Sequence, residues 1–242
     1  MREWIDFYDS DHSIYANARH KDVHFRRIAE DIASYVTETG TVVLDYGCGE
    51  ALHADVVAQK AAKLILVEPA PGVRARLEQK FTGNPKIQVC APDDTNIMPD
   101  GSVDLIVMHS VTQYLTAEEL IAALRRVRRL IKPTGRFVLG DVLPPRHSAL
   151  SEAAALLRFG SKEGFFVPAA TSLLRVLFSD YRRLRSSFGL ARYDEDTMIA
   201  KLAVWGFTAT RQPGNIGHNP ARMTFVSRPT LSKNEMKKVS IA

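Results

Sequence analysis

Residues 42–51, VVLDYGCGEA, are the stretch that decides the fold of this chain. The first five residues have the composition of a buried strand, and Gly47 and Gly49 follow at once. Glycine lets the backbone turn sharply and approach a ligand closely, while the helix expected next begins with free N–H groups. The pattern therefore predicts a strand, a glycine loop and a helix that favour a nucleotide-like ligand. A plain tight turn is the alternative interpretation.

Short apolar runs alternate with longer helical patterns after this stretch, which is typical of a parallel sheet covered by helices. Five strands are expected, at 42–46, 64–68, 87–91, 103–109 and 136–141. A hairpin-like pair at 207–210 and 223–227 would complete the sheet. Helices are expected at 18–37 and 117–131, and a third from Asp194 or Thr197 to Gly206. Thr116 and Glu119 have the spacing of a capping box for the second of these helices.

The chain is expected to divide into five parts. An irregular aromatic and acidic arm with one helix spans 1–40, and a ligand-binding core spans 41–145. A largely helical insert at 146–192 follows Pro144 and Pro145 and is the candidate lid. Residues 193–230 complete the sheet, and the polar tail comprises 231–242.

Composition excludes several classes of protein. The chain has 242 residues, of which 45% are hydrophobic and 24% charged, as in an ordinary globular protein. Its N-terminus lacks the apolar stretch of a secretion signal, and no run of about 18 apolar residues occurs. Cys48 and Cys90 have no pairing or metal-binding spacing, so a cytoplasmic location and no metal site are expected. The net charge of +5 favours anionic partners only mildly.

Acidic residues follow the ends of successive expected strands. Asp45 precedes the glycine loop, where its carboxylate can brace the loop or accept from a ligand ammonium. Glu68 ends the second strand, where an acidic side chain can bind both hydroxyls of a ribose. Asp93 and Asp94 follow the third strand, where a carboxylate can accept from an adenine amino group. Each carboxylate alone fits a solvated loop residue, but together they indicate an adenosyl ligand.

These motifs, together with PDGSVD at 99–104 and LIKPTGR at 130–136, resemble the class I S-adenosylmethionine-dependent methyltransferases. The resemblance covers about residues 20–142 and is closest to the small-molecule branch. Ala51 stands where the family has a third glycine. A dinucleotide loop would have glycine at position 52, where this chain has Leu52, which argues against a nicotinamide cofactor.

The resemblance implies a Rossmann-like methyltransferase fold with S-adenosyl-L-methionine as cofactor. It implies that Gly47 and Gly49 line the methionine part, that Glu68 holds the ribose, and that Asp93, preferred over Asp94, meets the adenine. It also places His109 beside the sulfonium and the acceptor. The full set of expected cofactor-binding residues is Asp45, Gly47, Cys48, Gly49, Glu68, Pro69, Asp93, Asp94, His109 and Ser110.

Methyl transfer requires a base only if the acceptor must lose a proton. His109 is the candidate base and the only catalytic residue expected. The arm and its helix offer alternatives, which are His12, Tyr15, His20 and His24. A structural hydrogen bond is the competing interpretation for each histidine.

The acceptor is the least determined part of the prediction. A small molecule methylated on oxygen or nitrogen is expected. The insert carries many arginines among its aromatic residues, which would suit an anionic or lipid-like acceptor; the competing interpretation is a lid with solvated arginines. A nucleic-acid methyltransferase and a non-catalytic S-adenosyl-binding module remain alternative functions. A homodimer is left open.

Overall fold

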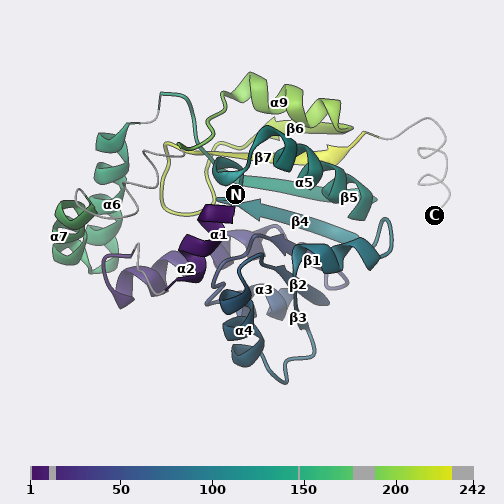
Figure 1. Ribbon diagram of the computed structural model, residues 1–242, viewed down its shortest axis with the longest axis horizontal. Helices are drawn as coiled ribbons and strands as arrows, with labels where there is room; N and C mark the ends of the chain where they lie inside the picture. The colour runs from purple at the N-terminus through teal and green to yellow at the C-terminus, as the bar shows by residue number, and fades with distance from the viewer. Residues whose placement is uncertain (1, 11–14, 147, 177–188, 231–242) are drawn as a thin grey trace.

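A computed structural model describes residues 2–10, 15–146, 148–176 and 189–230 (Figure 1). Seven strands form one sheet in the order β3-β2-β1-β4-β5-β7-β6. Strands β1 to β5 run parallel, and β7 is antiparallel to both β5 and β6. The strands are β1 (Val42–Tyr46), β2 (Lys63–Val67), β3 (Ile87–Cys90), β4 (Val103–His109), β5 (Ile131–Val142), β6 (Phe207–Arg211) and β7 (Met223–Pro229). The predicted doubly wound, mostly parallel seven-stranded sheet is confirmed.

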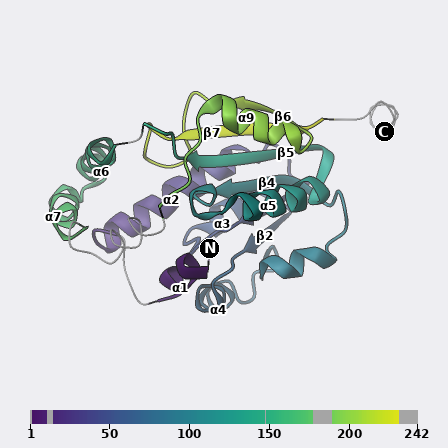
Figure 2. The ribbon, with the colours of Figure 1, turned by 45° about the horizontal axis from the view of Figure 1, so that its top comes forward.

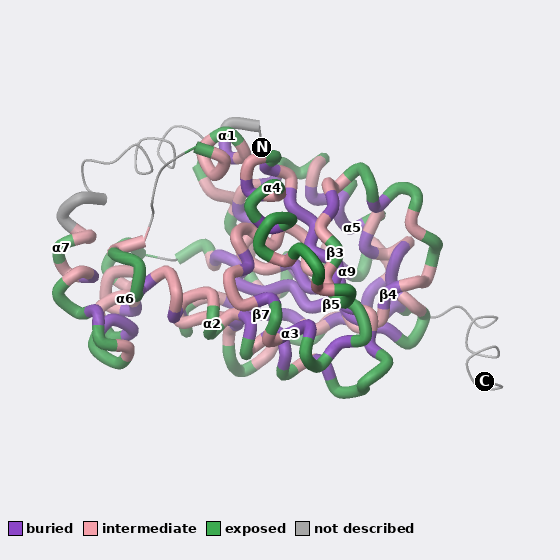
Figure 3. The backbone as a smooth tube through the Cα atoms, turned by 90° about the horizontal axis from the view of Figure 1, so that it is seen from below, coloured by how far each residue is buried: buried purple, intermediate pink, exposed green. Residues whose placement is uncertain are grey.

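Helices cover both faces of this sheet (Figure 2). One buried cluster joins the sheet to α2, α3 and α4, and a second joins it to α5 and α9. The helices are α1 (Arg2–Asp9), α2 (Ala18–Ser34), α3 (Ala54–Lys60), α4 (Pro71–Lys80), α5 (Ala117–Leu130), α6 (Ala149–Glu163), α7 (Phe166–Val176) and α9 (Glu195–Val204), with short 3-10 turns η1 (Pro92–Ile97) and η2 (Thr112–Tyr114). Figure 3 shows the buried backbone concentrated in the strands between these layers. No helix in the described ranges is long and apolar enough to cross a bilayer.

Several predicted boundaries differ from those observed. Strand β2 ends at Val67, so Glu68 is the first residue beyond the strand. Helix α5 ends at Leu130, and the chain passes directly into β5 at Ile131, ahead of the strand expected at 136–141. The pairing of β5 with β4 shifts register there, and a Cβ on Gly135 would lie 2.7 Å from Ile131 Cγ1 and 2.9 Å from the Asp104 carbonyl oxygen. The glycine therefore allows an irregular strand to begin before the expected residue 136.

The N-terminal arm was predicted to be irregular, and this is wrong for its first turns. Residues 2–9 form the helix α1. Trp4 packs against Tyr114 with ring centroids 4.6 Å apart, and the Tyr8 and Tyr114 hydroxyls lie 2.7 Å from each other. A helix of eight residues is unstable alone, so these tertiary contacts hold α1 in place.

The insert contributes α6 and α7, which lie to one side of the sheet beside the N-terminal end of α2 (Figure 1). Residues 177–188 of the insert, the tail at 231–242 and His12 lie outside the described residues. Helix α6 is bound to the rest of the chain by Arg19, whose Nε donates to the Glu163 carbonyl oxygen at 3.0 Å. The division into five parts and the role of the insert as a lid stay predictions.

The predicted capping box of α5 is confirmed. Thr116 Oγ1 accepts from the Glu119 N–H at 3.2 Å, and Glu119 Oε2 accepts from the Thr116 N–H at 2.9 Å. The apolar stripe that follows, including Leu120, Leu124 and Val127, is buried against the sheet. Local capping and burial thus specify the same helix.

Thr116→Ala is expected to lower the free energy of unfolding by about 1 kcal/mol, because it leaves helix N–H groups without a partner. Urea unfolding at neutral pH measures this change. Thr171→Ala, inside α7, is the matched control, because its hydroxyl bonds only to carbonyls of its own helix. The capping interpretation is wrong if the two variants have equal stability.

Candidate active site

A cavity of about 1470 Å3 opens at the carboxyl ends of β1, β2 and β4. Strands β1 and β4 are neighbours from opposite halves of the sheet, and crevices at this switch point are where doubly wound sheets bind ligands. Residues from α1, α2 and α6 close the cavity from the other side. The volume exceeds the usual range for one small ligand, so two molecules can be held together.

The glycine loop forms the floor of this cavity. Gly47 has φ +77°, and a Cβ there would lie 2.5 Å from Val111 Cγ2. The Gly47 and Cys48 N–H groups both donate to the Val67 carbonyl oxygen, at 2.7 and 3.2 Å. Gly49 has φ +58°, and nothing lies within 4 Å of the place where its Cβ would be. Glycine at this second position leaves open space above the loop.

Glu68 ties the glycine loop to the start of α4. Its Oε2 accepts from the Gly49 N–H and its Oε1 from the Ala70 N–H, both at 2.9 Å. The side chain is buried, and burial raises its pKa although these two hydrogen bonds lower it. Both carboxylate oxygens keep a lone pair for a further donor, such as a ligand hydroxyl.

Asp45 is the second carboxylate at the floor, and its side chain is half-buried. Burial, and then the charge of Glu68, raise its pKa to about 7. No described residue donates a hydrogen bond to its carboxylate, and the residue lines the cavity. Cys48 lies beside it with a free thiol, whose pKa burial raises well above its usual value, so the thiol stays protonated.

The floor is suited to a cation and not to a phosphate. The sequence suggested that free N–H groups would meet the ligand, but the loop N–H groups of residues 47, 48 and 49 bind a carbonyl and a carboxylate of the chain itself. Helix α3 begins only at Ala54. The carboxylates of the buried Glu68 and the half-buried Asp45 remain, with an open space over Gly49, and this arrangement fits a sulfonium or ammonium group.

Asp93 and Asp94 are not brought into the cavity wall. Both lie on η1, directly after β3. Asp94 Oδ2 accepts from the Ala91 N–H at 2.7 Å, and the exposed Asp93 lies 3.9 Å from Arg126. Pro69, in contrast, lines the cavity next to Glu68. The adenine-binding role of the two aspartates stays a prediction.

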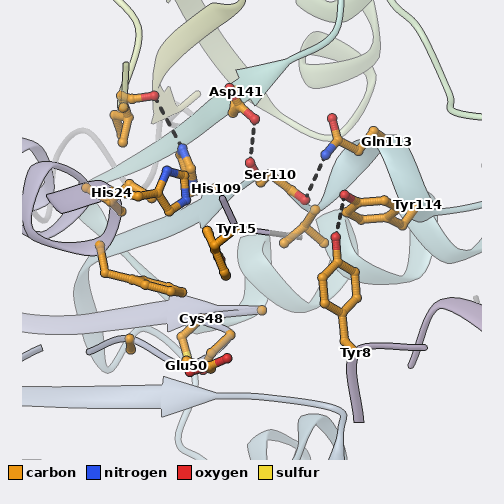
Figure 4. A pocket seen from close by; sticks show the side chains of 18 of the residues that line it. Tyr8, Tyr15, His24, Cys48, Glu50, His109, Ser110, Gln113, Tyr114 and Asp141 are labelled. Atoms are coloured by element: carbon orange, nitrogen blue, oxygen red, sulfur yellow. Dashed lines mark hydrogen bonds between the residues drawn. The ribbon is translucent and has the colours of Figure 1, made fainter. Parts of the chain in front are cut away.

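His109 and Ser110 stand at the end of β4, where the cavity continues beyond the glycine loop (Figure 4). His109 Nε2 lies 3.3 Å from the Ile216 carbonyl oxygen, and burial lowers the pKa of the imidazole. Because a carbonyl can only accept, we infer that Nε2 carries the proton and that Nδ1 keeps a lone pair. His109 is therefore neutral near pH 7 with a basic nitrogen available.

A buried polar network lies next to His109, and the sequence did not reveal it. Asp141 Oδ2 accepts from the Ser110 hydroxyl and from Arg222 Nη1, the latter at 2.6 Å. Arg222 also donates to Gln113 Oε1 at 3.1 Å and to Glu152 Oε1 at 2.8 Å. Burial disfavours ionisation of Asp141, but Arg222 and then His109 lower its pKa below the usual value. The only available signal was the turn-rich loop 214–222, to which the sequence assigned no role.

Residues with a strained backbone line the same cavity. Among the residues that the structure describes, three other than glycine have positive φ, and all three line it: Ala51 at +38°, Ser110 at +57° and Asp141 at +62°. Such conformations cost about 1–3 kcal/mol each and persist where the surroundings impose them, often at functional sites. Ala51 occupies the place of the expected third glycine and adopts a glycine-like conformation there.

Rings form the remaining side of the cavity. His20 and His24 come from α2, His218 comes from the loop before β7, and Tyr15 precedes α2. Burial is the main cause that lowers the pKa of His20 and His218 to about 4 and the pKa of His24 well below its usual value. In the described part of the chain, no three His, Cys, Asp or Glu side chains are placed to hold a metal ion.

Helix α1 covers the cavity next to the glycine loop. Asp9 Oδ1 accepts from the Val73 N–H at 3.0 Å and so caps α4, whose own N-cap residue Ala70 has no side-chain hydrogen bond. A Cβ on Gly72 would lie 2.6 Å from Asp9 Oδ1, so glycine is needed for this approach. Figure 4 shows Tyr8 of this helix meeting Tyr114 at the cavity. The arm thus shields the floor from solvent.

Comparison with known proteins agrees with this geometry. The family described as "Methyltransferase domain" matches residues 44–139, which include the end of β1, the glycine loop, Glu68 and His109. Residues 44–139 therefore match a methyltransferase domain, and the sheet has the Rossmann-like fold of the class I S-adenosylmethionine-dependent methyltransferases. S-adenosylmethionine is the cofactor of this family, and the carboxylate-lined floor and open Gly49 fit a cationic adenosyl compound.

Individual relatives are more distant. The chain is 28% identical to a cypemycin N-terminal methyltransferase of a Streptomyces species over 106 residues, or 43% of each chain. It spans 43% and 65% of the lengths of the two curated relatives that it matches. In fold it is similar to the mitomycin 7-O-methyltransferase MmcR, with TM-score 0.58, 19% identity, and coverage of 85% of this chain and 54% of that one. It is also similar to a 1,6-didemethyltoxoflavin-N1-methyltransferase of Burkholderia thailandensis, solved with 1,6-didemethyltoxoflavin and S-adenosylhomocysteine, with TM-score 0.56, 14% identity, and coverage of 86% and 79%.

The raised pKa of Asp45 leads to a pH dependence of cofactor binding. A cation stabilises the ionised carboxylate, so affinity for S-adenosylmethionine is expected to be highest above pH 7 and to fall as the pH drops through about 7. Linkage to one proton weakens binding by about tenfold between pH 8 and pH 6. Titration calorimetry at both values measures it. Asp45→Asn is the control and should remove the difference; an unchanged pH dependence in this variant would assign it to another group.

Proposed function

We propose that this chain transfers the methyl group of S-adenosylmethionine to an oxygen or nitrogen atom of a small-molecule acceptor. One observation carries the proposal. A single cavity joins a floor with two carboxylates of raised pKa to a second region lined by neutral imidazoles, and its volume of about 1470 Å3 suits a cofactor and an acceptor side by side.

The floor residues hold the cofactor in this proposal. S-adenosylmethionine supplies, when bound, a methyl group on a sulfonium that is reactive enough for direct displacement. Gly47 and Gly49 line its methionine part, Asp45 meets its positive charge, and Glu68 accepts from the ribose hydroxyls through its remaining lone pairs. Asp93 is the proposed partner of the adenine, with Asp94 as its alternative.

The other end of the cavity binds the acceptor. Most of the catalysis lies in holding the acceptor atom close to the methyl carbon and in excluding water. Trp4 and Tyr8 of α1 cover the site, and α6 contributes Glu152 to its wall. His109 accepts the proton of an acceptor hydroxyl or N–H group at Nδ1, since Nε2 is bound to the Ile216 carbonyl.

A small molecule is favoured over a polymer because the site is enclosed by segments from three parts of the chain. Helices α1, α2 and α6 all contribute side chains to the cavity lining. The named activities of the similar structures, 7-O-methylation of mitomycin and N1-methylation of 1,6-didemethyltoxoflavin, support small acceptors of both kinds.

Glu68→Ala is expected to weaken S-adenosylmethionine binding by well over tenfold, because it removes a charged acceptor and releases the Gly49 loop. Glu68→Gln, which keeps one acceptor oxygen, should lose less. Titration calorimetry with S-adenosylmethionine and S-adenosylhomocysteine measures both variants. Glu78→Ala on the exposed face of α4 is the control. Binding of NADH but neither adenosyl compound by the unaltered protein would refute the proposal.

His109→Gln is expected to lower kcat by about 100-fold or more for an acceptor that loses a proton, which is the usual contribution of a general base. Affinity for S-adenosylmethionine should stay the same, because His109 acts on the acceptor. A radiolabelled methyl-transfer assay and calorimetry give the two values. An unaltered kcat would leave His109 with a structural role only.

A further inference from the structure

Two stacked ring pairs form the wall of the cavity at the acceptor end. His20 stacks on Phe165 with centroids 4.7 Å apart and planes 14° from parallel, and His218 stacks on Phe159 at 4.5 Å and 12°. Both phenylalanines are buried behind the imidazoles, which face the cavity. His24 fills the corner, with its centroid 6.1 Å from that of His20 and 5.7 Å from that of His218. We call His20, His24 and His218 the imidazole wall.

The imidazole wall is rigid as well as aromatic. His20 Nδ1 accepts from the Ala16 N–H at 3.1 Å, and the N–H of His20 itself donates to the Asn17 side chain at 2.8 Å. Figure 4 shows the Tyr15 ring lying between His24 and the glycine-loop residues Cys48 and Glu50. Tyr15 also packs against His20 and His24, each with centroids 5.5 Å apart. Flat rings are thus fixed on the side from which an acceptor must approach the floor.

Charge at this end is balanced within the protein. The low pKa values of His20 and His218 keep both imidazoles neutral at pH 7. Lys21 forms an ion pair with Glu50, and Arg222 is held between Asp141 and Glu152. Both of these cations line the cavity, and both already have carboxylate partners. An anionic acceptor finds little here to replace its hydration.

One polar atom of the wall still needs a partner. His24 Nδ1 is buried and makes no hydrogen bond to any described residue. Buried polar groups in proteins are nearly always hydrogen-bonded, to the protein, to water or to a ligand. Because this nitrogen is closed to solvent, a hydroxyl or N–H group on a neutral ring in the cavity bonds to it only when the His24 ring turns toward the cavity.

We propose that the imidazole wall is the acceptor subsite and that it selects a neutral, planar aromatic molecule bearing a hydroxyl or ring N–H group. This inference rests on the proposed function. In the transfer to a hydroxyl, the acceptor oxygen forms a bond to the methyl carbon as the carbon–sulfur bond breaks. That electron pair stays on sulfur, and the hydroxyl proton passes to His109 Nδ1. The products are the methyl ether and S-adenosylhomocysteine.

A matched set of three probes tests the chemical class. They are 1-naphthol, its anionic counterpart 1-hydroxy-2-naphthoate and its saturated counterpart decahydro-1-naphthol. Titration calorimetry is done on the full chain saturated with S-adenosylhomocysteine. We expect 1-naphthol to bind at least about tenfold more tightly than either of the others, the order of magnitude that ring contacts supply. Equal or tighter binding of the anionic or the saturated probe would overturn the inference, as would failure of all three to bind.

Two substitutions test the wall itself. His218→Leu removes the ring and is expected to weaken 1-naphthol binding by about tenfold, whereas His218→Phe keeps the stack on Phe159 and should retain most of it. Phe81→Leu, a ring substitution outside the cavity, is the control. Unchanged binding in His218→Leu would refute the role of the wall.

Cofactor binding separates this inference from the proposed function. S-adenosylhomocysteine should bind all three variants as it binds the unaltered chain, which also shows that they are folded. If the unaltered chain binds S-adenosylhomocysteine but none of the probes, the acceptor class is wrong and the proposed methyltransferase remains. If it binds no adenosyl compound, the proposed function itself fails.

Discussion

The active site depends on the hydrogen bonds of one buried carboxylate. Glu68 accepts from the Gly49 N–H and from the Ala70 N–H and so joins the loop after β1 to the beginning of α4. Burying a carboxylate is costly unless donors compensate it, and backbone N–H groups are such donors. The same bonds use up N–H groups that would otherwise attract a phosphate. Glycine loops with free N–H groups bind anions. In this chain the N–H groups are already bonded, so the loop forms the floor of a site for a cation.

The two ends of the cavity differ in charge. At the floor, Asp45 and Glu68 concentrate negative charge in a buried environment, which raises both of their pKa values. At the other end, burial keeps the histidines neutral, and Arg222 is neutralised by Asp141 and Glu152. A positively charged cofactor and a neutral acceptor are the pair of molecules that this division suits. His109 stands between the two ends with a free lone pair.

Segments distant in sequence complete the enclosure. Helix α1 places Asp9 on the N-terminus of α4, where Gly72 leaves room for it. Helix α2 contributes His20 and His24, and α6 joins the polar network through Glu152. These contacts also explain why α1 is helical although its sequence looks irregular. Its Trp4 and Tyr8 lie on one face and bury against Tyr114.

Local chemistry in the sequence was sufficient to predict the sheet, the glycine loop and the carboxylates at the strand ends. Strand periodicity, glycine and capping residues act over a few neighbours, so Asp45, Gly49 and Glu68 could be placed from the order of residues alone. The sequence alone could not predict three other features. They are the hydrogen bond between Glu68 and Gly49, the neutral state of the imidazoles, and the network around Arg222. They depend on which side chains meet across the fold and on how much water is excluded there, and only the tertiary structure decides this.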